Sequence, residues 1–552
     1  MAKLKSVTVG FLGGVGEIGK NMTVLGFGNK YMIVDAGQSF PTEDTPGIDN
    51  VIPDMTFVRE NCGNIVGLFL THGHEDHIGA VPYLLQEFDL HVYGSDLTIA
   101  LLQSKLEERK IKSNKLHVVK AGDVTVANPF KVEYIHVCHS IAGAFALSVT
   151  TPAGVVFFTG DYKFDYTPPE GGLTDIPRLS RIGDRGVLLM LGESTNVERE
   201  GSTVSERMVG ENFDMLFDDN ASRRIIVATF ASNVNRLQQI INTAVKYRRK
   251  VAFGGRSMVK IAEIGRQLGL LHVEPESLVD IDKIKKVPDE ELVIVSTGSQ
   301  GEQMSALTRM AAGEYNKIHL GANDTVIISA SPIPGNERSV YSVINNLCRL
   351  GCKVVYHTLK DIHVSGHAHR EELKLMLSLV RPKMFIPVHG EYRHLTMHAD
   401  LAETMGVARR NILIPEIGAL VRVNARGVKR IGSIPAGNTY IDGDESGEDS
   451  MEMIIRDRRQ LASDGLVLVF VSVRLSDGKL ASAPEVLLRG VAAADDFVND
   501  VKSDIQQVMA KERYTDPDKR GALKSKLGRA VRNRARQYMH SLPMVVPVIV
   551  EV

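Results

Sequence analysis

The stretch Thr-His-Gly-His-Glu-Asp-His-Ile-Gly-Ala at residues 71–80 decides how the rest of the chain is interpreted. It places three imidazoles and one carboxylate, those of His72, His74, His77 and Asp76, within six positions. The apolar run at residues 65–70 predicts a buried strand that ends at these side chains. Imidazole nitrogen and carboxylate oxygen suit Zn²⁺ or the similar-sized Mn²⁺. This spacing at a strand-to-helix corner therefore predicts ligands that diverge to serve two ions.

The composition is that of a globular protein with several domains. The chain has 552 residues, of which 43% are hydrophobic and 24% are charged, and its formal net charge is −1. This balance excludes a disordered chain, and the length is enough for about three domains. The first residues lack the apolar core of a signal peptide, and no apolar stretch is long enough to span a bilayer. The sequence thus predicts a cytoplasmic protein with no membrane partner.

The four cysteines predict neither a disulfide framework nor a thiolate zinc site, because none of them forms a C-x-x-C pair. We expect Cys62, Cys138, Cys348 and Cys352 to be reduced packing residues. Overall neutrality argues against a surface coated in positive charge for nucleic acid. The basic run at residues 511–536 is either a solvated helix face or a surface that contacts phosphate.

The glycines near the N-terminus imitate a dinucleotide-binding motif. The letters G-V-G-E-I-G at residues 14–19 match G-x-G-x-x-G, and Asp35 follows at the spacing of a ribose-binding acid. Such a site needs a helix after the glycines, whereas residues 21–27 and 31–35 have the pattern of a β-hairpin. We therefore expect a tight glycine turn close to the metal site, with the strand end at Asp35 facing the same place.

Two further candidate ligands follow predicted strands. The strand at residues 130–137 leads to His139, and the strand at residues 155–159 leads to Asp161. Strands separated by helices, with polar residues at the strand ends, indicate an α/β sandwich whose site lies along one rim. H-x-H-x-D-H, a separated His and an Asp in T-G-D together resemble the metallo-β-lactamase fold. That resemblance implies that His72, His74 and His139 bind one ion, that Asp76 and His77 bind the other, and that Asp161 bridges both.

A regular alternation of strands and helices occupies residues 206–360. Four predicted strands there, at residues 225–229, 250–253, 292–296 and 325–329, end in small polar loops. Such loops favour phosphate at helix N-termini, although ordinary α/β turn chemistry explains any single one of them equally well. Candidate site residues resume at residues 362–369, I-H-V-S-G-H-A-H, and at His389 after a predicted strand. The long α/β stretch therefore interrupts one catalytic domain instead of following it.

That arrangement resembles the β-CASP subgroup of nucleic-acid-processing metallo-β-lactamase proteins. Ten motifs in order are similar to those of bacterial ribonuclease J, and the likeness covers essentially the whole chain. They lie at residues 13–21, 71–79, 160–165, 194–196, 229–239, 296–302, 331–336, 363–367, 387–393 and 456–461. The resemblance implies an α/β fold, namely a metallo-β-lactamase αββα sandwich interrupted by an inserted αβ β-CASP domain, plus a small C-terminal αβ domain.

The expected domain bounds follow from the same resemblance. Residues 1–206 and 362–441 would form the metallo-β-lactamase core, and residues 207–361 the β-CASP domain. An acidic linker at residues 442–452 would lead to a C-terminal domain at residues 453–552, with strands at residues 467–473 and 545–551. This last domain would favour homodimers or homotetramers.

The resemblance also implies roles for individual residues. His389 would be a seventh metal ligand near Asp76 and His77. His367 and Glu193 would form a catalytic pair that assists departure of the leaving group, and Glu193 stands where many relatives have Asp, which leaves its reach open. RNA phosphates, including a 5′ monophosphate, would be held by Ser232, Asn233, Val234, His363, Val364, Ser365, Gly366 and His367.

The implied cofactors are two divalent metal ions, with Zn²⁺ favoured and Mn²⁺ or Mg²⁺ as alternatives. Asp49 and Asp442 stand where some relatives hold a structural Ca²⁺, an ion that prefers carboxylate oxygens. Carboxylates that merely cap loops are the alternative reading of these two residues.

The expected function is that of a metal-dependent ribonuclease that degrades 5′-monophosphorylated single-stranded RNA from 5′ to 3′. Endonucleolytic cleavage is a second expected activity, and rRNA maturation and mRNA decay are the expected processes. A phosphate pocket at a fixed distance from the metals would measure one nucleotide, and a 5′ triphosphate should fit it poorly. A DNA-directed β-CASP nuclease and a non-catalytic RNA-binding scaffold stay open, as do partners in an RNA-decay complex. A thioester or lactam hydrolase would not need the inserted domain.

Overall fold

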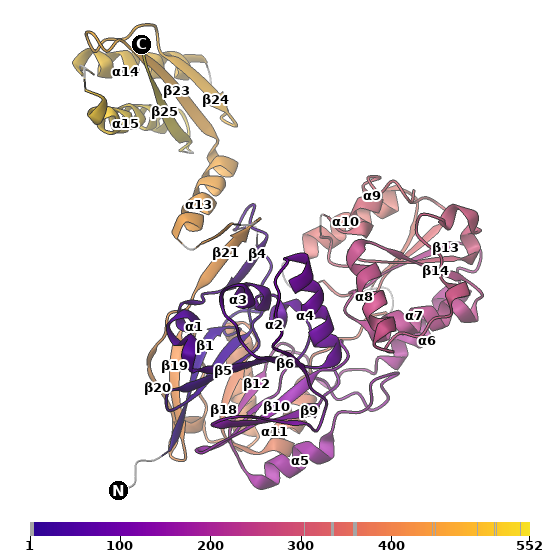
Figure 1. Ribbon diagram of the computed structural model, residues 1–552. Coiled ribbons are helices and arrows are strands. Elements are labelled where there is room, and N and C mark those ends of the chain that lie inside the picture. Colours follow the sequence, from indigo (N-terminus) through magenta and orange to yellow (C-terminus); the bar gives the residue numbers. More distant parts are fainter. Residues whose placement is uncertain are drawn as a thin grey trace. The chain divides into compact units, whose positions relative to one another are not determined.

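The computed structural model describes residues 5–552, except residues 43, 303, 333–335, 357–361, 444, 448, 494, 513, 515 and 541. The expected boundary at residue 361 and the centre of the motif at residues 331–336 lie outside the described residues. The chain forms two compact units, Met1–Ser39 with Ile52–Asn438 and Phe40–Val51 with Thr439–Val552 (Figure 1). In the described part of the chain, no helix is long and apolar enough to cross a membrane.

An eight-stranded sheet opens the first unit, in the order β20-β19-β1-β2-β3-β5-β6-β7. Strands β1, β2 and β3 are antiparallel neighbours, so the N-terminal glycines lead into a hairpin and not into a helix. The hairpin expectation is confirmed, and a dinucleotide site is excluded. The strands are β1 (Ser6–Gly13), β2 (Met22–Phe27), β3 (Lys30–Val34), β5 (Ile65–Phe69), β6 (Val92–Gly94), β7 (Leu116–Val118), β19 (Ala419–Asn424) and β20 (Gly427–Ser433), and the accompanying helices are α1 (Thr56–Asn61), α2 (Glu75–Ile78), α3 (Val81–Glu87) and α4 (Asp96–Glu108).

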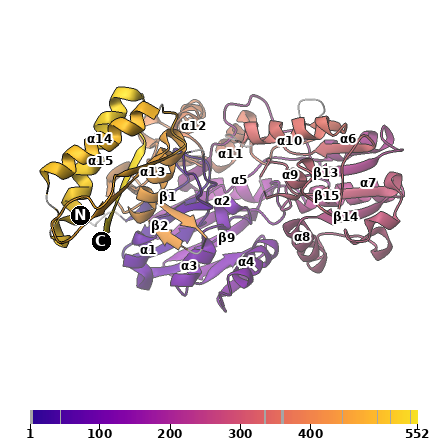
Figure 2. The same ribbon diagram turned by 90° about the horizontal axis from the view of Figure 1, so that it is seen from above.

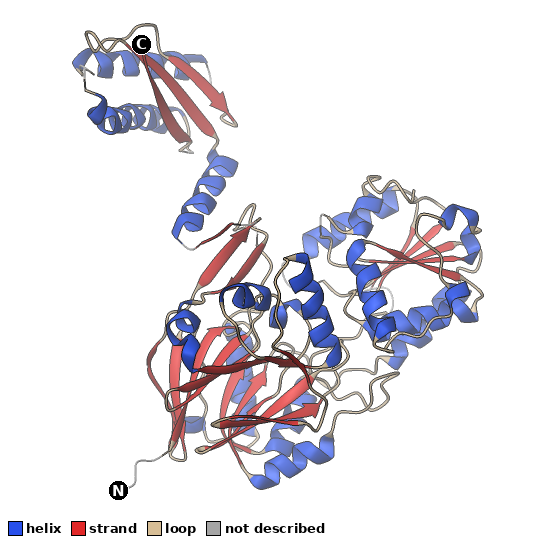
Figure 3. Cartoon of the chain, in the orientation of Figure 1, coloured by secondary structure: helices blue, strands red, loops and turns tan. Residues whose placement is uncertain are grey.

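A six-stranded sheet, in the order β18-β12-β11-β10-β9-β8, packs against the first sheet (Figure 3). Their shared core joins Val9 and Phe69 of one sheet to Leu147 and Leu189 of the other, all fully buried. A second core lies between this sheet and helices, which completes the αββα sandwich. The elements are β8 (Val124–Ala127), β9 (Phe130–His136), β10 (Phe145–Thr151), β11 (Gly154–Phe158), β12 (Val187–Glu193), β18 (Pro382–Val388), α5 (Ile176–Arg185), α11 (Arg370–Val380) and α12 (Tyr392–Thr404).

The sandwich is interrupted, as the sequence predicts. Strands β18, β19 and β20 come late in the chain and still join the two sheets: β18 pairs with β12, β19 pairs with β1, and β20 pairs with β19. The segment between β12 and β18 forms its own parallel sheet, in the order β14-β15-β13-β16-β17, with helices around it (Figure 2). Its elements are β13 (Arg224–Ala228), β14 (Lys250–Gly254), β15 (Leu292–Ser296), β16 (Asp324–Ile328), β17 (Lys353–Tyr356), α6 (Arg207–Asp218), α7 (Val234–Lys246), α8 (Arg256–Gln267), α9 (Ala306–Ala311) and α10 (Glu337–Arg349).

The second unit contains a sheet in the order β24-β23-β25, made by β24 (Glu485–Arg489), β23 (Leu466–Val473) and β25 (Met544–Glu551). Alternate valines of β23, such as Val467 and Val469, are fully buried in one core with Phe497 of α14 (Asp495–Lys511) and Leu527 of α15 (Arg520–Tyr538). The expected basic run forms α15, whose Arg534 binds Asp500 and Asp504.

The acidic stretch at residues 442–452, which the sequence predicts to be a linker, contains parts of regular elements. It holds the end of β21 (Asn438–Asp442), all of β22 (Glu445–Gly447) and the start of α13 (Asp449–Asp464). β21 pairs with β22 and with β4 (Asn50–Pro53), so backbone hydrogen bonds order residues that composition alone assigns to a linker.

The cysteines lead to a first testable prediction. All four are free, with Cys62 and Cys348 exposed and Cys138 and Cys352 buried. Burial raises the pKa of the Cys352 thiol to about 11, and the thiolate is the nucleophile. We expect iodoacetamide at pH 8 to alkylate Cys62 and Cys348 of the native protein and to spare Cys138 and Cys352 until urea is added. Peptide mass spectrometry checks this, and labelling of native Cys352 as fast as Cys348 would contradict it.

Candidate metal centre

Seven side chains that the sequence singles out meet at one rim of the sandwich. His72 and His74 follow β5, Asp76 and His77 lie in the short helix α2, and the other three follow β9, β11 and β18. They form two neighbouring groups, within each of which the ligand atoms lie within 4.8 Å of one another. The first group is His72, His74 and His139, and the second is Asp76, His77, Asp161 and His389.

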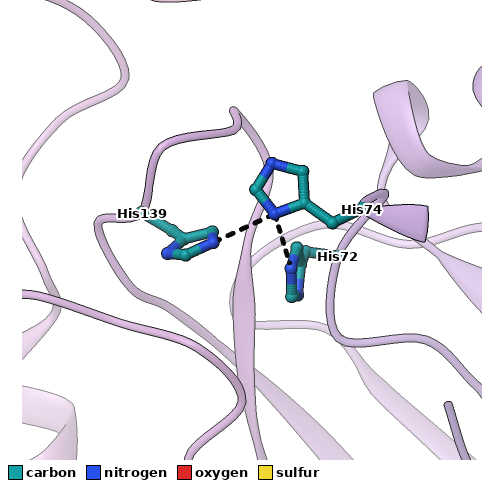
Figure 4. A group of neighbouring side chains, drawn as sticks. All are labelled: His72, His74 and His139. Carbon is teal, nitrogen blue, oxygen red and sulfur yellow. Dashed lines mark hydrogen bonds between the residues drawn. The ribbon is translucent and has the colours of Figure 1, made fainter. Parts of the chain in front are cut away.

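The first group has the spacing of a metal site (Figure 4). His74 Nδ1 lies 3.1 Å from His72 Nε2 and 3.2 Å from His139 Nε2. Tetrahedral zinc, with Zn–N bonds of about 2.0–2.1 Å, separates its nitrogen ligands by about 3.3 Å. Three imidazole nitrogens at this spacing fit one cation.

Hydrogen bonds behind the rings set which nitrogen faces the centre. His139 Nδ1 donates to the carbonyl oxygen of Gly366 at 2.7 Å, because a carbonyl can only accept. Thr71 donates its hydroxyl to Asp35 at 2.8 Å, so it accepts from His72 Nδ1 at 3.1 Å. The Nε2 atoms of His72 and His139 therefore carry lone pairs. Burial lowers the pKa of both imidazoles well below the usual range, and that of His74 to about 4, so all three imidazoles are neutral.

The second group is richer in charge. His77 Nε2 lies 3.2 Å from Asp161 Oδ2, and His389 Nε2 lies 3.3 Å from Asp76 Oδ2. Burial disfavours the charged imidazoles, but the two carboxylates outweigh it, so the pKa of His77 is raised well above its usual value and that of His389 to about 10. The protonated imidazoles thus balance the charge of the buried Asp161 carboxylate and the partly exposed Asp76 carboxylate, a role that suits a divalent cation.

Asp161 lies between the two groups. Its Oδ2 atom is 3.2 Å from His77 Nε2, 3.7 Å from His72 Nε2 and 4.0 Å from His139 Nε2. The neighbouring histidines overcome the effect of burial and lower the pKa of this carboxyl well below its usual range. A permanently ionised carboxylate between two sets of ligands is suited to bridge two cations.

Asp35 is a supporting residue whose role the sequence does not reveal. Its carboxylate accepts hydrogen bonds from the Thr71 backbone N–H at 2.7 Å, the Thr71 hydroxyl at 2.8 Å and His77 Nδ1 at 2.8 Å. These bonds orient His77 with Nε2 toward the centre, as carboxylates behind metal-binding histidines commonly do. The nearest signal in the sequence is the position of Asp35 at the end of a predicted strand, which was expected to face the metal site.

Two non-glycine residues at the centre have left-handed backbones, Asp35 with φ 58° and His389 with φ 52°. Such conformations are uncommon and tend to persist where surrounding contacts enforce them, often at functional sites. Here the His389 N–H donates to Gly14 at 2.7 Å, and Gly16 and Glu17 form β-bridges with Glu391 and Gly390. The glycine turn therefore holds the segment that carries His389. The turn was expected to lie close to the site, and it does.

The expected catalytic pair also comes together. Glu193 Oε2 lies 3.5 Å from His367 Nδ1, so a glutamate at this position does reach the histidine. The Glu193 carboxylate accepts from the backbone N–H groups of Thr195 at 3.1 Å and Ala368 at 3.2 Å. His367 Nδ1 is also 3.8 Å from Asp161, and its side chain is 24% exposed, so a substrate can reach it.

Comparison with known proteins identifies the family. Models of the "Metallo-beta-lactamase superfamily", the "Ribonuclease J, beta-CASP domain", the "Zn-dependent metallo-hydrolase RNA specificity domain" and the "Ribonuclease J C-terminal domain" match residues 15–201, 222–347, 352–415 and 453–552. Ribonuclease J of Mycobacterium tuberculosis is 41% identical over 98% of this chain and 96% of its own length. This chain belongs to the ribonuclease J family.

Other members of the ribonuclease J family agree with this placement. Ribonuclease J2 of Bacillus subtilis is 37% identical over 99% of each chain. Ribonuclease J of Helicobacter pylori is 42% identical over 89% of this chain and 71% of its own length. A crystal structure of a protein of unknown function from Enterococcus faecalis has a TM-score of 0.56 at 17% identity, over 76% of this chain and all of that one, which supports the fold alone.

The residues expected to hold RNA phosphate in a ribonuclease J divide into two sets. Asn233 caps helix α7, and the side chains of Asn233 and Val234 are almost fully buried, so they offer backbone and helix dipole instead of side-chain contacts. Ser232 is half-buried in the same loop. Within the other set, at residues 363–367, His363 accepts a hydrogen bond from Arg236 of α7 at 3.0 Å, which joins the two loops.

A pocket lies between the segment that follows β9 and the start of α7. It is lined by His139 and Ser140 on the sandwich side and by Asn233 and Asn235 at the start of α7. The start of α7 and one candidate ligand, His139, therefore line the same pocket.

The two candidate calcium ligands lie close together in the second unit. Asp49 donates its backbone N–H to Ile441 at 2.8 Å, and its carboxylate accepts from the Gly443 N–H at 2.8 Å. The Asp442 carboxylate accepts from Arg458 at 2.6 Å. A calcium ion there would have to share Asp442 with this guanidinium.

Proposed function

We propose that this metal-dependent ribonuclease binds two divalent cations through seven ligands and degrades RNA from a 5′-monophosphorylated end. The observation that carries the proposal is the pair of ligand groups with Asp161 between them. Three neutral imidazoles favour Zn²⁺ in the first group, and the carboxylates of the second also suit Mn²⁺ or Mg²⁺. The proposed ligands are His72, His74 and His139 for one ion, Asp76, His77 and His389 for the other, and Asp161 for both.

Two divalent cations held by these seven residues would offset the charge of the phosphodiester and lower the pKa of a water molecule, so that hydroxide would be available as the nucleophile. The chain's own groups then act on the leaving 3′ oxygen. His367 lies beside Asp161 and can donate a proton as charge builds on that oxygen, and its Nδ1 atom lies 3.5 Å from the Glu193 carboxylate, which favours the protonated ring. Glu193 is in turn fixed by backbone N–H groups, so the pair is oriented before the substrate arrives.

The phosphate-binding loops support an exonuclease. The Gly366 carbonyl accepts from His139, so the loop at residues 363–367 is tied directly to a metal ligand. A 5′ phosphate held by this loop and by the α7 terminus would lie at a constant distance from the metals, and one nucleotide would be released per cut. Endonucleolytic cleavage is a further activity that we propose for RNA entering without such an end, and rRNA maturation and mRNA decay are the proposed processes.

A comparison of RNA ends tests the proposal. We expect 5′-monophosphorylated single-stranded RNA to release mononucleotides, the 5′-triphosphorylated RNA to react at least about tenfold more slowly, as loss of one charged hydrogen bond would cause, and EDTA to stop both reactions until Zn²⁺ or Mn²⁺ is restored. Equal rates on both RNA ends would contradict the phosphate pocket. Equal rates on matching DNA would favour a DNA-directed nuclease, and binding without cleavage would favour a scaffold.

We also propose domain bounds and an assembly. The bounds are residues 1–206 and 362–441 for the core, 207–361 for the β-CASP domain, 442–452 for the connection and 453–552 for the assembly domain. Leu487 and Val546 lie on the face of the C-terminal sheet opposite its buried valines and are 37% and 36% exposed, which supports a homodimer or homotetramer through this face. Because the substrate is RNA, we propose the cytoplasm as the location and other RNA-decay proteins as partners. Asp49 and Asp442 remain proposed Ca²⁺ ligands.

A further inference from the structure

Asn196 lies behind the loop at residues 363–367 and holds it from one side. It follows β12 by three residues and comes from a part of the chain that is 169 residues away from Ser365 in sequence. Its amide nitrogen Nδ2 lies 2.7 Å from Ser365 Oγ and 3.2 Å from the carbonyl oxygen of His367. One side chain thus contacts both a proposed phosphate ligand and the backbone of the proposed catalytic histidine.

The orientation of the Asn196 amide follows from these two contacts. The His367 carbonyl can only accept a hydrogen bond, so the group that faces it must be the NH₂ and not the amide oxygen. The same NH₂ then donates its second hydrogen to Ser365 Oγ. The backbone N–H of His367 donates to Ser365 Oγ as well, at 3.1 Å.

These two donors determine what the Ser365 hydroxyl can do. A serine hydroxyl has one hydrogen to donate and two lone pairs that accept. Asn196 and the His367 N–H occupy both lone pairs, so Ser365 can only be a donor toward any further partner. Ser365 is half-buried, which leaves its hydrogen within reach of a ligand. A phosphate oxygen, which only accepts, is the matching partner.

The position of this donor is tightly constrained. The next residue, Gly366, packs so closely on the sandwich that a Cβ atom there would lie 2.6 Å from Ser140 Oγ and 2.7 Å from the His139 ring. Its carbonyl accepts from His139 Nδ1 at 2.7 Å. The Ser365 hydroxyl is therefore one residue from a contact with a proposed metal ligand and two residues from His367.

We propose that Asn196 is a positioning residue that makes Ser365 an obligate donor to the terminal phosphate and thereby sets the preference for 5′-monophosphate over 5′-hydroxyl RNA. The inference rests on the proposed phosphate-binding function of the loop and adds a specificity-determining residue to it. A terminal phosphate offers anionic acceptors to a fixed donor, whereas a 5′-hydroxyl end offers no charge and can reorient. Hydrogen bonds to charged groups are stronger than those to neutral groups, so a fixed donor at Ser365 favours RNA with a terminal phosphate over RNA with a 5′ hydroxyl.

The test compares Asn196→Ala with the full-length wild type on RNAs of one sequence that carry a 5′ monophosphate or a 5′ hydroxyl. We expect KM for the monophosphate RNA to rise about tenfold, since a hydrogen bond to a charged group is lost or weakened. We expect kcat on that RNA, and both constants for the hydroxyl RNA, to change much less than this KM, because Asn196 contacts only the backbone of His367 and the His367 side chain keeps its positions near Glu193 and Asp161. Asn196→Asp should raise KM further, since its carboxylate would attract the Ser365 hydrogen and repel phosphate.

A double-mutant cycle asks whether Asn196 acts through Ser365. Ser365→Ala alone should also raise KM about tenfold, and Asn196→Ala with Ser365→Ala should be no worse than Ser365→Ala, because contacting residues that share one function are not additive. Equal loss of kcat on both RNA ends, or fully additive effects, would overturn the proposal and leave Asn196 a structural residue. Should Asn196→Ala fail to fold, Ser365→Ala must still lose the preference on its own.

Asn411→Ala is the matched control, because Asn411 Nδ2 donates to the Lys383 carbonyl at 3.0 Å in a similar way but at an exposed position. It should leave both constants unchanged. A wild type that shows no preference for the monophosphate end would instead contradict the proposed function itself. A wild type with the preference and an Asn196→Ala variant that keeps it would contradict this inference alone.

Discussion

Replacing Asp161 with Asn should lower kcat on 5′-monophosphorylated RNA by at least about a thousandfold, equivalent to about 4 kcal/mol of transition-state stabilisation. Asp161 lies between both ligand groups, and an amide oxygen binds cations more weakly than a carboxylate because it carries no net charge. The variant keeps an oxygen that can accept from His389 Nδ1, which now lies 2.8 Å from Asp161 Oδ1. Single-turnover cleavage of end-labelled RNA measures the loss, and elemental analysis measures bound metal.

His74→Ala should be as inactive as Asp161→Asn, because it removes the nitrogen that lies closest to both partners in the first group. Both variants are expected to keep the fold, as circular dichroism and thermal unfolding would show. Asp400→Asn, which changes an exposed carboxylate paired with Arg409, is the control and should cleave normally. Full activity in Asp161→Asn or His74→Ala would overturn the assignment of the metal centre.

Asp35→Asn should weaken metal binding by about 10- to 100-fold, the usual effect of losing a partner behind a metal ligand. The carboxylate of Asp35 now accepts from three donors on Thr71 and His77. An asparagine must turn its NH₂ toward one of them. If that NH₂ faces His77, Nδ1 becomes an acceptor and Nε2 carries the hydrogen, so the ring no longer offers its lone pair to the centre.

The effect of Asp35→Asn should appear in metal affinity more than in chemistry. Titration against a chromophoric chelator gives the affinity, and the dependence of cleavage on added Zn²⁺ or Mn²⁺ should move to higher concentrations and then recover much of the wild-type rate. Unchanged affinity in a folded variant would show that His77 is held by other contacts. Loss of activity that no metal concentration restores would place Asp35 in the chemistry itself.

That the seven candidate ligands gather in one place could be predicted from the sequence, because the segments that carry them follow strands at the same rim. Apolar runs end just before His72, Asp161 and His389, and the structure places β5, β11 and β18 with their carboxyl ends at the centre. The interruption of the sandwich was predictable for a similar reason, since candidate ligands resume after the α/β stretch. Local patterns suffice where a short segment carries both the strand and the ligand.

Other features depend on contacts between segments that are distant in sequence, so no local sequence pattern predicts them. Thr71 meets Asp35 because β3 and β5 are parallel neighbours, and Asn196 meets Ser365 across the active-site rim. The buried side chain of Val234 is likewise a matter of packing within the inserted domain. The β22 strand in the expected linker forms through pairing with β21, which acidic composition conceals.

The late position of β18, β19 and β20 has a consequence for how the enzyme is made. A ribosome must translate the whole inserted domain before it reaches His389 and the strands that pair with β12 and β1. Until then the edges of both sheets at β12 and β1 are unpaired, and the second group of candidate ligands lacks His389. A nascent or prematurely terminated chain that ends before residue 389 is therefore expected to lack nuclease activity.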